Sequence, residues 1–223
     1  MALQFMHKYE LSSTLALYII RGSVLDFASM NGAIVNAANE GCLGGGGVDG
    51  AITIAGGPKL AKDRKKLKLI KRGIRCLTGD AVITGPDEYG KIQTPYVIHA
   101  VGPNYWEQPD SEAAHELLRR AYQASLQLAD DHGLTEIAFP LLSAGVFRAS
   151  IPLSVILKNA VVGISEWRKD GSTSLEKVIL YAFTPEECDE LRMVCEDLLG
   201  KGNFDTQNTL SEPADLPDPM DTN

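Results

Sequence analysis

The chain has 223 residues, 44% of them hydrophobic, with 21 glycines and a formal net charge of −8. This length suits one domain that buries a sizeable core without disulfides or metals, and the composition is globular. The acidic balance disfavours broad contact with nucleic acid or an anionic membrane, because both bind basic surfaces. No apolar run approaches the roughly 20 residues needed to cross a bilayer.

Short apolar runs alternate with helical patterns, which is typical of βαβ units around a parallel or mixed sheet. We therefore predict an α/β fold. The predicted strands are 15–20, 33–37, 80–84, 96–101, 136–140 and 177–183, with 4–10 as a further edge strand.

Five helical patterns accompany these strands: one from Val48, one over 58–70, one from Asp110 or Ser111 to Gly133, one from Pro152, and one capped by Thr184 and Glu187. The segment from Lys59 to Arg75 carries nine basic residues and one acid. We interpret the lysine-rich helix over 58–70 as a solvated face, with a binding patch as the alternative. We predict one domain over residues 1–199. The acidic, proline-containing residues 200–223 are predicted to be a disordered tail.

The four cysteines form neither a CxxC pair nor a zinc-spaced cluster with histidine. We expect reduced thiols, no metal, and a cytoplasmic or nuclear protein.

Two loops carry the clearest functional signal. Four glycines, Gly44 to Gly47, lie between a buried strand and a helix, where backbone N–H groups can bind an anion. The loop Ser143-Ala-Gly-Val-Phe147 follows another strand, and its small residues Ser143, Ala144 and Gly145 let backbone N–H groups point at a ligand. The glycine run fits neither a dinucleotide fingerprint nor a P-loop. Because ligands of open α/β sheets bind beyond the carboxyl ends of the strands, the two loops suit a diphosphate.

Four motifs follow one another between Leu15 and Leu199: Asn36-Ala-Ala-Asn39, the four glycines with Val48-Asp49-Gly50, Val97-Ile-His-Ala-Val-Gly-Pro103, and the Ser143 loop. In this combination the chain resembles the macrodomain family, most closely its MacroD-like branch. The resemblance implies a three-layer α/β/α fold with a central mixed sheet that binds ADP-ribose. It also implies hydrolysis of the ester that joins ADP-ribose to acidic side chains, and deacetylation of O-acetyl-ADP-ribose, with no cofactor.

The resemblance assigns Asp49 to the catalytic water and Asn39 to the distal ribose. An ordinary N-cap remains the alternative for Asp49, and a turn-forming residue the alternative for Asn39. The residues predicted to bind the ligand are Ser23, Val24, Asn36, Gly45, Gly46, Gly47, Val48, Ser143, Ala144, Gly145, Val146, Phe147, Arg148 and Phe183.

Three of these roles have open alternatives. Phe183 matches the adenine-stacking position, yet it could instead form a hydrophobic staple against Cys188. Phe147 could be a core aromatic beneath its loop, and Asn36 could be structural. His99 is interpreted as a structural histidine.

Three positions depart from the family pattern. Ser23 replaces the aspartate that accepts from the adenine amino group, and Asp26 could substitute for it. Arg148 replaces a glycine, and Thr53 stands where MacroD-like sequences usually have histidine.

From the resemblance as a whole we expect a monomeric hydrolase that acts on mono-ADP-ribosylated proteins. The alternatives are a non-enzymatic ADP-ribose reader and a phosphatase that acts on ADP-ribose 1″-phosphate.

Overall fold

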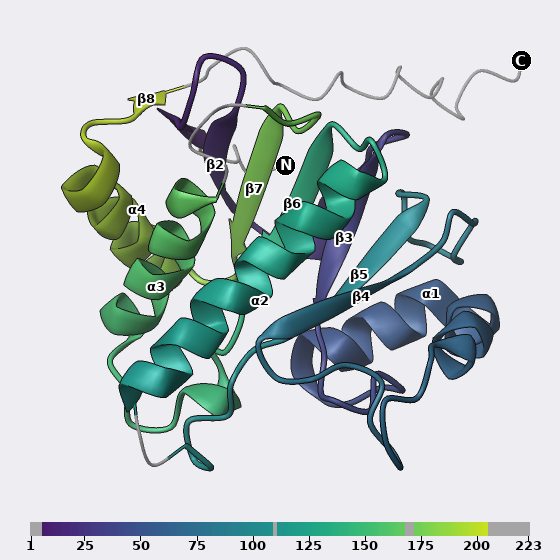
Figure 1. Ribbon diagram of the computed structural model, residues 1–223. Coiled ribbons are helices and arrows are strands. Elements are labelled where there is room, and N and C mark those ends of the chain that lie inside the picture. The colour runs from purple at the N-terminus through teal and green to yellow at the C-terminus, as the bar shows by residue number, and fades with distance from the viewer. Residues whose placement is uncertain (1–5, 109–110, 168–171, 205–223) are drawn as a thin grey trace, which may run out of the picture.

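The computed structural model describes residues 6–108, 111–167 and 172–204 and has the predicted three-layer α/β/α architecture (Figure 1). A mixed sheet forms the middle layer, with eight strands in the order β4-β5-β3-β6-β7-β2-β1-β8. The strands are β1 (Met6–Glu10), β2 (Ala16–Arg21), β3 (Gly32–Ala37), β4 (Asp80–Thr84), β5 (Tyr96–Val101), β6 (Glu136–Pro140), β7 (Lys177–Ala182) and β8 (Asn203–Phe204).

Helices cover both faces of this sheet. The α-helices are α1 (Gly47–Lys66), α2 (Ser111–Asp131), α3 (Leu153–Glu166) and α4 (Pro185–Leu199), and two 3₁₀ turns are η1 (Val24–Asp26) and η2 (Val146–Arg148). Side chains alternate between the faces, as a strand requires. Ala33 and Val35 belong to the core beneath α2, α3 and α4, whereas Ile34 belongs to the core beneath α1.

The five inner strands β5, β3, β6, β7 and β2 are parallel, and β4, β1 and β8 pair antiparallel at the two ends of the sheet. The carboxyl ends of the five parallel strands therefore meet at one edge. The loops that follow them are brought together there, although they come from positions as far apart as 22 and 183.

The two helices predicted from Val48 and over 58–70 form one kinked element. Gly57 has φ 62° and ψ −159°, and the helix resumes at Pro58, which is suited to a first turn because it has no N–H group to leave unpaired. Leu67 already has extended backbone, so α1 ends at Lys66 and the predicted end at Ile70 is wrong.

The signals that end or begin the other helices are confirmed. Gly133 has φ 65° just beyond α2, and the Thr184 side chain accepts from the backbone N–H of Glu187 at 3.1 Å while the Glu187 side chain accepts from that of Thr184. Pro152 caps α3. The predicted N-cap Asp110 lies outside the described residues.

The start of the predicted disordered tail has a different structure. Asn203–Phe204 form β8, which pairs antiparallel with His7 and Lys8 of β1, so the prediction of disorder is wrong for these two residues. Residues 205–223, and residues 4 and 5 of the predicted edge strand, lie outside the described part of the chain.

All four cysteines are free thiols, as expected. In the part of the chain that the structure covers, no helix has the length and apolar character needed to traverse a bilayer.

Candidate active site

The predicted site residues gather at the carboxyl edge of the parallel strands. Ser23 follows β2, the segment from Asn39 to Val48 follows β3, the Ser143 loop follows β6, and Phe183 follows β7. The strand order places the β3 and β6 loops side by side, with the β7 and β2 loops next in line. An elongated ligand can therefore contact all four in turn.

Asp49 lies in the first turn of α1 and is 2% exposed. Its Oδ1 accepts from Asn36 Nδ2 at 2.9 Å and from Arg64 Nη2 at 2.7 Å. Its Oδ2 is also buried and has no hydrogen-bond partner among the described residues. One oxygen is thus held firmly by two donors, and the other remains able to accept.

Asp49 is linked through Asn36 to a buried chain of hydrogen-bonded polar side chains. Asn36 is fully buried, and its Nδ2 also lies 3.1 Å from His99 Nδ1, while His99 Nε2 lies 3.0 Å from Thr84 Oγ1. Because Asn36 donates to Nδ1, the ring proton is assigned to Nε2, which donates to Thr84. The predicted ligand contact of Asn36 is therefore revised: its amide nitrogen orients Asp49, and His99 is structural, as expected.

Asn39 closes the turn that leads into the glycine run. Its Nδ2 donates to the carbonyl of Gly44 at 3.0 Å, and its Oδ1 accepts from the N–H of Gly41 at 3.1 Å. A Cβ on Gly45 would lie 3.1 Å from Asp49 Oδ2 and 3.3 Å from Asn39 Nδ2. The two predicted catalytic side chains therefore meet at Gly45, where a side chain would crowd both.

The glycine run exposes backbone at the start of α1. The first helical hydrogen bond runs from Gly50 N–H to the carbonyl of Gly46, so the N–H groups of Gly47, Val48 and Asp49 precede the helical ladder. Gly46 caps the helix without a side-chain bond, and the space around a Cβ on Gly46 or Gly47 is open. This geometry suits an anion.

The second loop is built around Ser143, a non-glycine residue with φ 56°. Its Oγ donates to the carbonyl of Pro103 at 2.9 Å, which ties the β6 loop to the β5 loop. Ala144 is buried, Gly145 and Val146 are exposed, and Phe147 is half-buried, with its carbonyl accepting from Tyr105 N–H at 2.8 Å.

Arg148 braces this second loop. Its Nε donates to the carbonyl of Ala144 at 3.1 Å, and its Nη1 donates to that of Ile151 at 2.9 Å. Two of its five N–H donors are therefore used within the loop. The predicted contact of Arg148 with the ligand stays a prediction for the remaining donors.

The contact between the β5 and β6 loops makes Gly102 sensitive to substitution. A Cβ at Gly102 would overlap Ser143 Oγ, which is buried and cannot swing freely. We expect Gly102→Ala to cost about 1–3 kcal/mol of unfolding free energy, measured by urea denaturation. Adding Ser143→Gly removes the overlapping atoms and should restore much of that loss. An equal loss in the single and double variants would contradict this explanation.

In the loop after β2, the polar side chains accept hydrogen bonds from backbone N–H groups of the same loop. Ser23 Oγ accepts from the N–H of Leu25 at 3.2 Å, and Asp26 Oδ2 accepts from the N–H of Ser23 at 2.9 Å, which forms a capping box at η1. Val24 is buried in the core beneath α1. One oxygen of Asp26 is thus bound to the backbone rather than turned to a ligand.

Phe183 is 76% exposed, and its N–H donates to Glu187 Oε2 at 2.8 Å. A ring that packed against Cys188 as a staple would be covered, so the exposure argues against that alternative. The ring is open to a stacking partner at the end of β7.

Arg64 is the site residue that the sequence prediction missed. It is 1% exposed and ion-paired with Asp49, although it lies in the lysine-rich run that we interpreted as a solvated face. That interpretation holds for Lys62 and Lys65, which are exposed, and is wrong for Arg64. Its spacing from Leu60, four residues earlier and fully buried, is the signal that could have revealed it.

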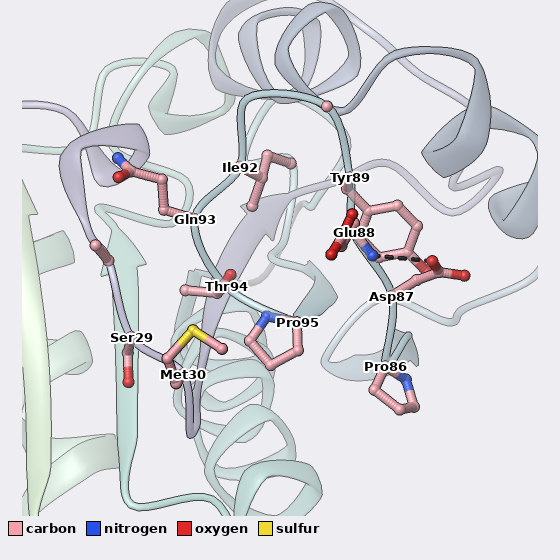
Figure 2. Close-up of a pocket in the computed structure, with 12 residues that line it drawn as sticks. Ser29, Met30, Pro86, Asp87, Glu88, Tyr89, Ile92, Gln93, Thr94 and Pro95 are labelled. Atoms are coloured by element: carbon pink, nitrogen blue, oxygen red, sulfur yellow. Dashed lines mark hydrogen bonds between the residues drawn. The ribbon is translucent and has the colours of Figure 1, made fainter.

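A large hollow of about 980 Å³ lies at the opposite edge of the sheet, before β3 and β5 begin (Figure 2). Met30, Ile92, Thr94 and Pro95 line it, and none of the predicted site residues does. Within the described ranges, no group of three or more His, Cys, Asp or Glu side chains is arranged to hold a metal ion.

A comparison with protein families matches residues 35–155 to the Macro domain. Curated relatives include O-acetyl-ADP-ribose deacetylase 1 of Pantoea vagans, which is 39% identical over 177 residues, covering 77% of this chain and 93% of the relative. A macro domain-containing protein of Caldanaerobacter subterraneus is 39% identical over 164 residues, covering 74% and 87%.

Solved structures agree with these relatives. The Oceanobacillus iheyensis macrodomain with ADP superposes with a TM-score of 0.75 at 30% identity, covering 88% of this chain and 98% of that one. The Trypanosoma brucei macrodomain in complex with ADP-ribose gives a TM-score of 0.65 at 31% identity, covering 78% and 67%.

Proposed function

The chain belongs to the macrodomain family, and on that premise we propose that it binds ADP-ribose along the carboxyl edge of the sheet and hydrolyses esters at the distal ribose. O-acetyl-ADP-ribose is one substrate. Proteins that carry mono-ADP-ribose on an acidic side chain are the other. The observation that carries the proposal is the arrangement of Asp49, with one carboxylate oxygen fixed by two donors and the other without a partner.

Each part of ADP-ribose has a matching group along the edge. The N–H groups at the start of α1 and the Ser143 loop suit the two phosphates, because anions are favoured at unpaired backbone N–H groups. The exposed ring of Phe183 suits the adenine, which would place the distal ribose at Asp49 and Asn39.

Asp49 acts on a water molecule in this proposal. The water donates a hydrogen bond to Oδ2, and its oxygen attacks the acyl carbon of the acetyl ester. The bond between that carbon and the ribose oxygen breaks, the ribose oxygen takes up a proton, and acetate and ADP-ribose leave. A carboxylate already paired with Arg64 orients the water more than it removes its proton, and in this proposal a phosphate oxygen of the substrate assists in orienting the water.

The non-enzymatic reader remains the second candidate, because Asp49 Oδ2 is buried beside Gly45. A water must reach this oxygen for hydrolysis, whereas binding of ADP-ribose needs only the exposed loops. The two functions therefore make different demands on the same site.

One sample can distinguish these functions. We expect calorimetric titration to give a one-to-one complex with ADP-ribose, and the same preparation to release acetate from O-acetyl-ADP-ribose and ADP-ribose from a peptide modified on glutamate. Binding without release would select the reader. Release of phosphate from ADP-ribose 1″-phosphate alone would select the phosphatase, and absence of ADP-ribose binding would refute the proposal as a whole.

A further inference from the structure

The guanidinium of Arg64 is buried, and each of its three nitrogen atoms donates a hydrogen bond. Nη2 pairs with Asp49 Oδ1 at 2.7 Å, Nη1 donates to Thr53 Oγ1 at 2.9 Å, and Nε donates to the carbonyl of Cys42. A planar group held at three points has one orientation, so the position of Nη2 beside Asp49 is fixed.

Thr53 completes this arrangement from the same helix as Asp49. Its hydroxyl donates to the backbone carbonyl of Asp49 at 2.7 Å and accepts from Arg64 at the same time. Thr53 is also the position where the family resemblance leads one to expect histidine. Thr53 uses its hydroxyl both to seat the Arg64 guanidinium and to bond the helix that carries Asp49.

The ion pair with Arg64 determines which carboxylate oxygen of Asp49 remains able to accept a hydrogen bond from water. Oδ1 accepts from both Arg64 and Asn36, and Oδ2 lies beside Gly45 without a partner among the described side chains and backbone groups. Without the guanidinium, the carboxylate would be a buried charge with only a neutral donor, and its rotation would be less restricted.

We propose that Arg64 is the counter-ion and positioning residue of Asp49, seated by Thr53, and that it directs Oδ2 toward the water of the hydrolytic step. The inference rests on the proposed function for the catalytic part, while the charge pairing can be tested without any activity. Arg64 does not itself touch the ligand in this proposal.

The pairing is tested by urea denaturation of full-length variants. Arg64→Met should lower the denaturation midpoint, because it leaves Asp49 buried and unpaired. Adding Asp49→Asn should raise the midpoint above that of Arg64→Met, because the unpaired charge is then removed. Lys65→Met, the same change at the exposed neighbouring residue, should leave the midpoint near that of the wild type. A double variant no more stable than Arg64→Met would overturn the pairing.

The positioning role is tested by separating turnover from binding. For O-acetyl-ADP-ribose we expect Arg64→Met to reduce kcat by about a hundredfold, as a misplaced catalytic group does, while the Kd for ADP-ribose stays within about threefold. Arg64→Lys keeps the charge but not the planar fork and should recover about tenfold of that loss. Turnover of Arg64→Met equal to that of Lys65→Met would overturn the role, as would a loss of ADP-ribose binding as large as the loss of kcat.

Two further outcomes are also decisive. If Arg64→Met does not fold at the assay temperature, Arg64→Lys decides: a kcat about tenfold below wild type at unchanged Kd supports positioning, and parallel losses of both contradict it. If the wild type binds ADP-ribose but hydrolyses no ester, the hydrolase proposal and the positioning role fail together. The denaturation series then still supports or refutes Arg64 as the counter-ion.

Discussion

Asp49→Asn is expected to lower kcat for O-acetyl-ADP-ribose by at least about a hundredfold, because a group that orients or deprotonates the attacking water typically contributes 10²–10⁴ in rate. Asparagine keeps the size of the side chain but offers one oxygen instead of two, and it loses the charge. The Kd for ADP-ribose should change much less, since the backbone N–H groups that suit the phosphates are untouched. Steady-state release of acetate and calorimetry measure the two quantities.

The variant also leaves the buried guanidinium of Arg64 unpaired, so a loss of fold must be distinguished from a loss of chemistry. Thermal denaturation fixes an assay temperature at which Asp49→Asn is folded. Asp131→Asn makes the same change at an exposed position of α2 and should retain wild-type turnover. If Asp49→Asn retains full turnover when folded, Asp49 is not the catalytic carboxylate.

Acidification below pH 6.5 is expected to destabilise the protein through His99. Complete burial and the nearby Arg64 cation lower the pKa of His99 to about 3, from a usual value near 6.5. Between these values the unfolded chain binds a proton at His99 and the folded chain does not, so the free energy of unfolding falls as the pH falls. The slope from this residue is about 1.4 kcal/mol per pH unit across the window from 6.5 to 3.

Urea denaturation at several pH values measures this slope. His99→Gln removes the titrating ring and should flatten the pH dependence relative to the wild type, although its stability at neutral pH will be lower because the contacts to Asn36 and Thr84 change. The same slope in His99→Gln as in the wild type would show that other groups cause the acid sensitivity.

The sequence predicted the strands well because each signal was local. The runs 80–84, 96–101 and 136–140 match β4, β5 and β6 to the residue. For the inner strands β5 and β6 the reason is that a buried strand in a parallel sheet is apolar on both faces and flanked by turn residues. The edge strand β4 pairs antiparallel, and its apolar run alone was enough to locate it. The helix caps at Thr184 and Gly133 were equally local. The three-layer arrangement came instead from the family resemblance. The strand order was not predicted at all, because strand pairing is not encoded in any short window.

The site was predicted only in part, and the errors have one physical origin. A sequence shows the type of each side chain but not which neighbour uses its hydrogen-bonding groups. Arg64 looked like one more exposed cation among lysines until the fold placed it against Asp49. Asn36 looked able to reach a ligand, yet it is fully buried and its amide nitrogen donates to Asp49. The sequence likewise could not show that Arg148 uses two of its donors on the carbonyls of Ala144 and Ile151.

The parallel pairing of β2 with β7 also determines when the fold can form. These neighbouring strands are separated by about 160 residues along the chain. At 5–20 residues per second, a ribosome needs roughly ten to thirty seconds to make β7 after β2 has been synthesised. During that time β2 lacks one of its two neighbours and exposes backbone groups that could pair with another chain. A nascent chain that stops before Lys177 therefore lacks a strand from the middle of its sheet, which makes late synthesis the period of greatest aggregation risk.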